Sequence, residues 1–273
     1  MTPIELLKRF IADHLDGMPE KLAVYELRNL EGNELYGNPN GRRFDSDDTE
    51  LMRAVYQVVF AEAWNNIGDN LQNYRLRGDT LNTFATMFGK VRGDYRPEVH
   101  PGLDKHNPSP EMVELVENFH HVCWTMGNMM VLPNRLLGND SINTYRGCHN
   151  EWHDYEDRFL EALRKVLLKE PNVDERLKDL VELNYEFFNP FYGEQGWRSF
   201  IERNLLKDYV NEDYVPVVSS KGYCYWLTWH MTDEQYFAEA RRYITFSTEV
   251  IRKRSDRMIS IIKDALESHE QRI

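Results

Sequence analysis

The sequence has no long hydrophobic run, few cysteines, and little glycine or proline. No apolar stretch approaches the roughly 18 residues that a membrane-spanning helix needs. The opening segment, MTPIELLKRF, carries charges within its only apolar stretch and has no small-residue cleavage site, so we expect no secretory signal. These absences argue against a membrane or secreted protein and predict a cytoplasmic one.

The cysteine and glycine content narrows the fold class. The three cysteines, Cys123, Cys148 and Cys224, have no metal or redox spacing, and an odd number argues against a disulfide framework. Fifteen glycines and eleven prolines in 273 residues are slightly below average usage, which argues against many short strands joined by turns. Because no Gly/Ser-rich linker divides the chain, we expect a single domain over residues 1–273.

The charge balance is acidic. There are 45 Asp and Glu against 33 Lys and Arg, a formal net charge of −12, so nucleic acid is repelled at long range unless a local basic patch binds it. Hydrophobic residues make up 41% of the chain, as expected for a globular protein. The sequence contains no Gly-rich phosphate loop, nucleophile elbow or cysteine-based metal motif.

Helix-start signals recur and predict a mainly α-helical fold with little or no β structure. Thr2-Pro3-Ile4-Glu5 and Thr232-Asp233-Glu234-Gln235 are capping boxes, and the second begins a long C-terminal helix. Apolar residues at helical spacing predict further helices. Their approximate ranges are 47–66, 110 to at most 133, 150–169, 174–188 and 197–210. Residues 20–30 read as helix or loop, 90–110 as a long loop, and 215–230 as a non-helical structured segment.

Two short segments share one pattern, in which Asp and Ser or Thr are followed by an aliphatic residue, Asn, Thr and an aromatic residue. They are residues 79–84 and 140–145, and each lies where a helix could begin. Favoured helix caps explain most of the pattern but not an asparagine at the same place in both. Because buried asparagines need hydrogen-bond partners, we expect Asn82 and Asn143 to line one polar pocket.

Further polar residues fall in irregular segments near these two. Asn128, Asn134 and Arg146 offer amide groups and a fixed set of guanidinium donors suited to carboxylate or phosphate. With Asn82 and Asn143 they form the predicted ligand site, for a small anionic or phosphorylated ligand. The alternative interpretation is that these side chains satisfy backbone groups in a buried loop.

A second candidate site contains histidine. His149 and His153 are four residues apart, hence on one helical face, and Glu156 lies about one turn further. Two histidines and a carboxylate suit a divalent transition metal. The zinc-protease motif requires Glu directly after the first His, where this chain has Asn150. In the alternative interpretation His153 and Glu156 are a solvated pair, and we predict no other cofactor.

Positive charge is concentrated on the predicted C-terminal helix. These residues could contact nucleic-acid phosphates, or they could pair with the surplus acids of this chain or of a second copy, which would make the helix a homo-oligomer contact. They are Arg241, Arg242, Arg252, Lys253, Arg254 and Arg257.

Several motifs in fixed order resemble an uncharacterised family of bacterial cytosolic proteins over roughly residues 75–168. They are Gly78-Asp79-Thr80-Leu81-Asn82, Gly127-Asn128-Met129 through Leu132-Pro133-Asn134, and Ser141-Ile142-Asn143 with Arg146-Gly147. The family implies no activity. Residues 127–132 also resemble the tail of HNH-type nuclease domains, although those nucleases carry an Asp-His or His-His pair on an upstream strand. Here His120-His121 lies in a helical pattern.

Three hypotheses follow for the function. The first is a binding or interaction protein that uses the asparagine–arginine pocket. The second is a metal-assisted phosphodiesterase or nuclease using His120, His121 and the predicted metal ligands. The third is a structural or assembly protein whose C-terminal helix pairs between subunits. The lack of acid/base pairs with recognisable spacing favours the first.

Overall fold

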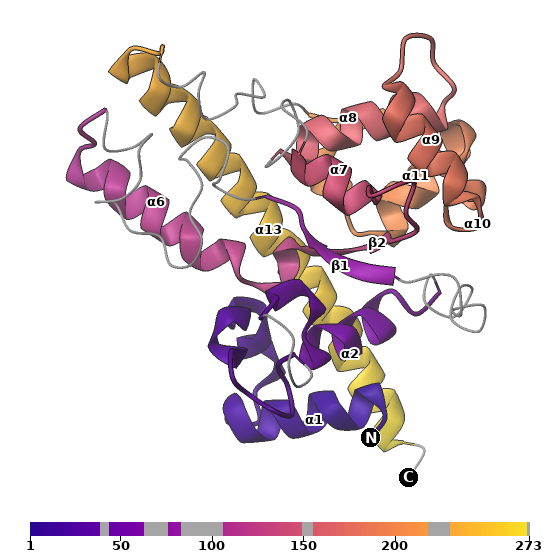
Figure 1. Cartoon of the computed structure of the whole chain (residues 1–273). Helices are drawn as coiled ribbons and strands as arrows, with labels where there is room; N and C mark the ends of the chain where they lie inside the picture. Colours follow the sequence, from indigo (N-terminus) through magenta and orange to yellow (C-terminus); the bar gives the residue numbers. More distant parts are fainter. Residues whose placement is uncertain (39–43, 63–75, 83–105, 149–154, 218–229, 272–273) are drawn as a thin grey trace.

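The computed structural model describes residues 1–38, 44–62, 76–82, 106–148, 155–217 and 230–271, and it is mainly α-helical with a long C-terminal helix (Figure 1). The α-helices are α1 (Pro3–His14), α2 (Glu50–Val59), α6 (Pro110–Cys123), α7 (Ile142–Cys148), α8 (Glu156–Leu167), α9 (Glu175–Leu183), α10 (Tyr185–Phe188), α11 (Gly193–Arg203) and α13 (Asp233–Glu270). The 3₁₀ segments are η1 (Pro19–Val24), η2 (Leu27–Leu30), η3 (Ser46–Asp48), η5 (Met126–Asn128), η6 (Asn189–Phe191) and η7 (Lys207–Tyr209). Two short strands, β1 (Leu76–Thr80) and β2 (Met129–Pro133), complete the described elements. The predicted fold class is confirmed.

Helix α13 runs the length of the molecule (Figure 1) and contacts α6, η5, η7 and the N-terminal elements α1, α2 and η1. The predicted capping box is present, since the Thr232 side chain accepts from the Gln235 amide and Gln235 accepts from the Thr232 amide. Along its 38 residues α13 packs against α6, then η5, then α2 and η1. Near its end, Glu270 forms an ion pair with Lys8 of α1, which brings the two ends of the chain together.

The N-terminal elements α1, α2 and η1–η3 form the lower group in Figure 1. The Thr2 capping box of α1 is confirmed. Residues 20–30, which the sequence left open between helix and loop, contain two short 3₁₀ segments, η1 and η2, and no α-helix. Helix α2 begins at Glu50 rather than near residue 47, because the Thr49 hydroxyl accepts the Met52 amide and makes Thr49 the N-cap.

The two strands form an antiparallel ribbon, in which Leu76 pairs with Pro133 and Thr80 with Met129. The helix predicted from residue 110 to at most 133 is α6, which starts as expected, with Ser109 as N-cap, and ends at Cys123. Strand β2, between the end of α6 and Pro133, was not predicted. Every residue of β2 is buried. An apolar run that is buried on both faces has no period that separates strand from helix, so the sequence pattern could not resolve it.

Helices α7 to α11 form the second group, at the upper right of Figure 1. The predicted helix over 174–188 is interrupted at Asn184, whose side chain donates to the Leu180 carbonyl and ends α9. The helix predicted over 197–210 is α11, which starts earlier and ends at Arg203. Leu205, two residues later, has a positive φ, so the chain leaves the helical conformation there. The helix predicted over 150–169 is described from Glu156 onward. Most of the loops predicted over 90–110 and 215–230 lies outside the described residues.

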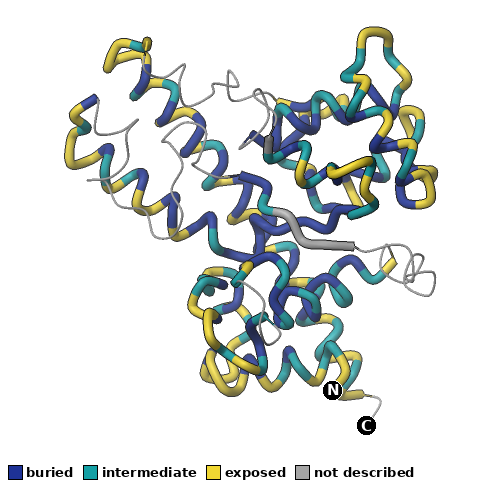
Figure 2. Tube along the Cα trace, in the orientation of Figure 1, coloured by how far each residue is buried: buried dark blue, intermediate teal, exposed yellow. Residues whose placement is uncertain are grey.

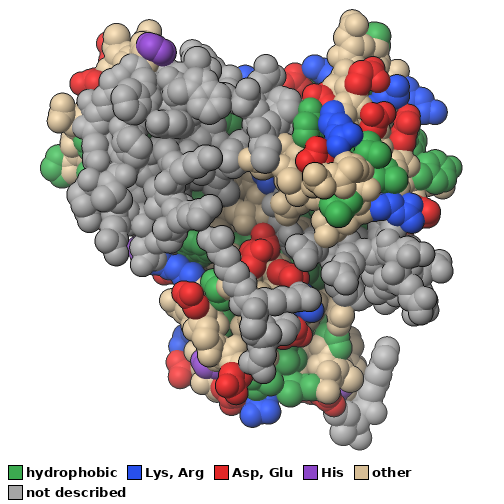
Figure 3. Space-filling model, viewed as in Figure 1, with side chains coloured by type: hydrophobic (Ala, Val, Ile, Leu, Met, Phe, Trp, Pro, Cys, Tyr) green, Lys and Arg blue, Asp and Glu red, His purple; other side chains and the backbone are tan. Residues whose placement is uncertain are grey.

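One apolar core joins the two groups of helices (Figure 2). It includes side chains from α1, α2, β2, α8 to α11 and the second half of α13. A smaller cluster fills the contact between α6 and the first half of α13. On the face shown in Figure 3, acidic side chains are scattered over the surface, in keeping with the net charge.

Candidate functional site

Two of the predicted pocket asparagines are in direct contact. The Asn128 side chain accepts a hydrogen bond from the Asn82 backbone amide (2.9 Å) and donates to the Asn82 carbonyl (2.7 Å). Its amide also donates to the carbonyl of Cys123 (2.9 Å). Both asparagines are buried. Asn82 lies two residues after β1 and Asn128 directly precedes β2, so the antiparallel register of the ribbon brings them together.

Arg146 reaches the same place from α7. Its guanidinium donates to the carbonyls of Thr80 (2.7 Å) and Leu81, the two residues before Asn82. Glu156, at the start of α8, forms an ion pair with Arg146 (Oε2 to NH2, 3.1 Å). Both side chains are at most 4% exposed. A buried charge is costly unless it is paired, and this pairing stabilises both charged forms.

Tyr209 contacts Asn82, and Arg254 contacts the turn that carries Asn128. The Asn82 side chain donates to the Tyr209 hydroxyl (2.5 Å), and the pKa of Tyr209 is raised by its burial and by the negative charge of Glu156. Arg254, in the middle of α13, donates to the carbonyls of Gly127 (2.7 Å) and Met129 (2.6 Å). Burial lowers the pKa of Arg254 to about 10, so its guanidinium stays protonated at neutral pH.

These six buried residues are called the polar centre below: Asn82, Asn128, Arg146, Glu156, Tyr209 and Arg254. They come from segments far apart in the sequence, and the polar centre lies where β1, β2, α7, α8, η7 and α13 meet. Sequence reasoning missed Tyr209 and placed Arg254 with the surface basic residues. A signal for Arg254 was present, because it falls on the same helical stripe as the buried residues Ile251 and Met258.

The other two predicted pocket residues lie outside the buried polar centre. Asn134 follows β2 and Asn143 lies in α7, one turn before Arg146, and both are partly exposed. The two echoed segments differ in local structure. Asp79 and Thr80 are in strand β1, which contradicts a helix start at these residues, whereas Ser141 caps α7 by accepting the Thr144 amide (3.1 Å).

The predicted metal ligands are only partly described. His149 and His153 lie outside the described residues, and Glu156 is the buried partner of Arg146 rather than a solvated residue. In the described parts of the chain, no group of three or more His, Cys, Asp or Glu side chains is arranged to hold a metal ion. His120 is buried and accepts from Arg28 (2.8 Å). A divalent metal and the nuclease activity stay predictions.

The predicted basic patch is largely engaged within the chain. Arg242 pairs with Glu239, Lys253 with Glu249, and Arg257 with Asp208, while Arg254 belongs to the polar centre. Arg241 and Arg252 are exposed. Nucleic-acid binding and pairing of α13 between subunits stay predictions. No helix in the described parts is long and apolar enough to cross a membrane.

Comparison with known families gives one match. The model of a family of unknown function, DUF6994, matches residues 103–258, more than half of the chain. The chain belongs to DUF6994. The predicted membership of an uncharacterised family is confirmed, although the matched DUF6994 region reaches far beyond residue 168. A search of curated proteins and of solved structures found no match.

The DUF6994 region contains five of the six residues of the polar centre, and Asn82 is the sixth. Asn82 is supplied by the segment after β1, outside the matched range, so the N-terminal part of the chain completes the polar centre. The family description carries no activity, and the function has to be argued from the polar centre itself.

Proposed function

We propose that this DUF6994 protein binds a small anionic ligand, with a carboxylate or phosphate group, at the polar centre. The observation that carries the proposal is the convergence of Asn82, Asn128 and Arg146, three of the five residues predicted for this role, in one buried cluster. Buried polar groups cost free energy, and arrangements of buried charges and shifted pKa values concentrate at functional sites.

Arg146 is the anion-binding group in this proposal. A guanidinium has five N–H donors in a fixed plane, which match carboxylate or phosphate oxygens in pairs. Two carbonyls orient this guanidinium, and the Glu156 carboxylate occupies its remaining side. A ligand anion takes the position of the Glu156 carboxylate, and Glu156 therefore acts as an internal competitor. Asn143 is partly exposed and lies one helical turn before Arg146 in α7, so it is the predicted pocket residue that an entering anion could meet first.

The experiment compares ligand binding by the wild-type protein and Glu156→Gln. Thermal unfolding is followed with inorganic phosphate, AMP, succinate and citrate, each across a concentration series. A ligand that binds only the folded state adds about 2.7 kcal/mol at a hundredfold excess over its Kd. We expect at least one of these anions to raise the Tm of the wild type, and E156Q to bind it more tightly because the competing charge is gone.

Two further variants separate a binding role from a structural one. Asn143→Ala changes a partly exposed side chain near Arg146, and Asn29→Ala changes an exposed asparagine on η2, in the N-terminal group. We expect N143A to weaken anion binding and N29A to leave it unchanged. The proposal is rejected if none of the four anions stabilises either the wild type or E156Q, or if E156Q binds the anion more weakly than the wild type does.

A further inference from the structure

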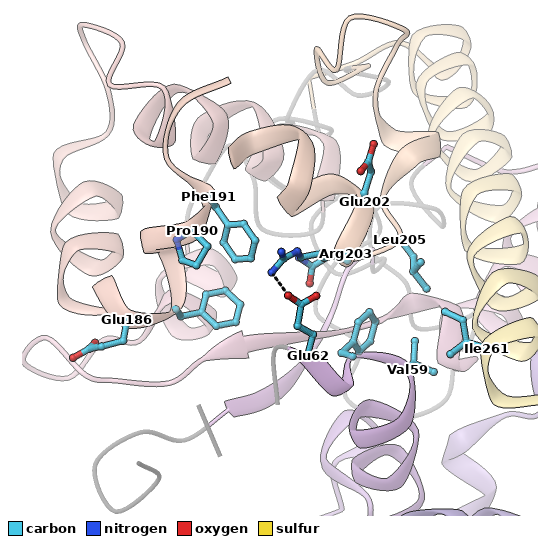
Figure 4. Close-up of a pocket in the computed structure, with 12 residues that line it drawn as sticks. Val59, Glu62, Glu186, Pro190, Phe191, Glu202, Arg203, Leu205 and Ile261 are labelled. Carbon is cyan, nitrogen blue, oxygen red and sulfur yellow. Dashed lines mark ion pairs between the residues drawn. The ribbon is translucent and has the colours of Figure 1, made fainter. Parts of the chain in front are cut away.

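A second candidate site lies where α2, the α10–η6 turn, the end of α11 and α13 meet (Figure 4). It is a cavity of about 260 Å³. Sites for drug-sized ligands measure roughly 300–1,000 Å³, so this cavity suits a smaller molecule. None of its lining residues belongs to the polar centre, although two of them, Phe60 and Asn204, contact Arg254. The proposal below does not rest on anion binding at the polar centre.

The walls of the cavity are apolar and partly aromatic. Phe60, Phe187 and Phe191 line it, and each is at most 5% exposed. Val59 and Ile261 add aliphatic surface from α2 and α13, on the side opposite Phe191 and Pro190 (Figure 4). Apolar walls favour a hydrocarbon body, and aromatic faces attract a cation placed over them.

The opening of the cavity carries one ion pair. Arg203 points across the cavity toward Glu62 and forms an ion pair with it at 2.8 Å (Figure 4). Two other glutamates are among the lining residues, Glu186 and Glu202, but their carboxylates point away from the cavity (Figure 4). Glu186 pairs with Arg135 at 3.5 Å, and Glu202 accepts a hydrogen bond from the Tyr214 hydroxyl. Glu62 is therefore the carboxylate that an incoming cation would meet.

The Arg203 side chain already shows how a cation is held at this opening. Its guanidinium carbon lies 5.9 Å from the centre of the Phe191 ring while its NH1 contacts Glu62. Both partners of this ion pair are about half exposed, with 42% for Arg203 and 60% for Glu62, so the pair is open to exchange with an external cation.

We propose that this cavity binds a small organic cation, a primary ammonium group on an aromatic or aliphatic body. The body fills the apolar space between Phe191 and Ile261, and the ammonium group replaces Arg203 as the partner of Glu62. An anion of the same shape would have to displace Glu62 from Arg203, and it would lie against the Phe191 ring face, which attracts cations and not anions.

The test uses three probes of one shape and different charge: 2-phenylethylammonium, 2-phenylethanol and phenylacetate. Binding to the full chain is measured by isothermal titration calorimetry. We expect saturable binding of the ammonium probe, weaker binding of the alcohol and none of the carboxylate. Glu62→Gln removes one charge from the opening at an exposed position and should weaken binding of the ammonium probe about two- to fivefold, as for one exposed ion pair.

A cavity-filling variant locates the binding. Ile261→Phe adds volume inside the cavity and should abolish binding of the ammonium probe, while Ser260→Phe adds the same ring at the neighbouring exposed position of α13 and should not. The proposal is overturned if the ammonium probe shows no saturable binding below about 10 mM. It is also overturned if phenylacetate binds as tightly, or if I261F binds the ammonium probe as the wild type does.

Discussion

Gly127, in η5, lets the turn that carries Asn128 lie directly against α13. A Cβ atom at this position would overlap the Ile251 carbonyl oxygen and the Ser255 hydroxyl, and would come within 2.9 Å of the Ser255 backbone nitrogen. Because two of these atoms belong to helix backbone, they cannot give way as a side chain would. We expect Gly127→Ala to lower the free energy of unfolding by about 1–3 kcal/mol, measured by urea titration.

Gly147, at the end of α7, provides the matched control for this substitution. Among the residues that the structure describes, no heavy atom lies within 4 Å of a Cβ atom built there, and its φ is not positive. Alanine should leave the stability unchanged or raise it by up to about 1 kcal/mol, because glycine loses more backbone entropy in a helix. Equal losses in the two variants would show that crowding against α13 is not the reason for glycine at position 127.

At the level of single residues, part of the candidate site could be predicted from the sequence. Asn82, Asn128 and Arg146 were found because asparagine and arginine in irregular segments need partners, and the ribbon supplies those partners. The contacts of Tyr209 with Asn82 and of Arg254 with the carbonyls of Gly127 and Met129 could not be predicted, since these partners lie more than a hundred residues away. Burial of Arg254 on an apolar helical stripe was visible in the spacing alone.

At the scale of elements, the cap of α13 is the clearest link between sequence and structure. The Thr232 hydroxyl accepts the Gln235 amide, one of the backbone donors that the start of a helix leaves without a partner. Thr232→Ala should lower the free energy of unfolding by about 0.5–2 kcal/mol. Thr245→Ala, at an exposed position within the same helix, should have no such cost because alanine has the higher helix propensity. Urea unfolding of both variants tests the difference, and an equal loss would contradict a capping role.

The boundaries of helices were predicted well where a capping residue defines them. Elements whose conformation depends on tertiary packing were predicted poorly. Capping residues such as Thr2, Ser109 and Thr232 correctly marked the starts of α1, α6 and α13. The strand β2 was missed because all five of its residues are buried, and pairing with a distant segment decided its conformation. The break at Asn184 was also missed, since it depends on one side chain that bonds to the preceding turn.

For the whole molecule, the extent of the apolar core bears on the prediction that residues 1–273 form a single domain. The core runs from Leu7 in α1 to Ile262 in α13 and includes residues of α8 to α11, so the two groups of helices share buried surface. Shared burial couples their unfolding, because neither group can lose its structure without exposing apolar area of the other. We therefore expect one cooperative unfolding transition for the described parts of the chain.

Ile262→Ala tests this coupling, because Ile262 is fully buried in the part of α13 that packs near the N-terminal group. The loss of a buried side chain of this size should cost about 2–5 kcal/mol. If unfolding is cooperative, hydrogen exchange should show the same loss of protection in α1 and in α11, although α11 belongs to the other group of helices. Protection lost in α1 alone, or two separate transitions by calorimetry, would mean that the N-terminal group unfolds by itself. Strand β1, which leads to Asn82, packs against η3 of that group, so the polar centre would then be linked to a part of the chain that can open independently of the DUF6994 region.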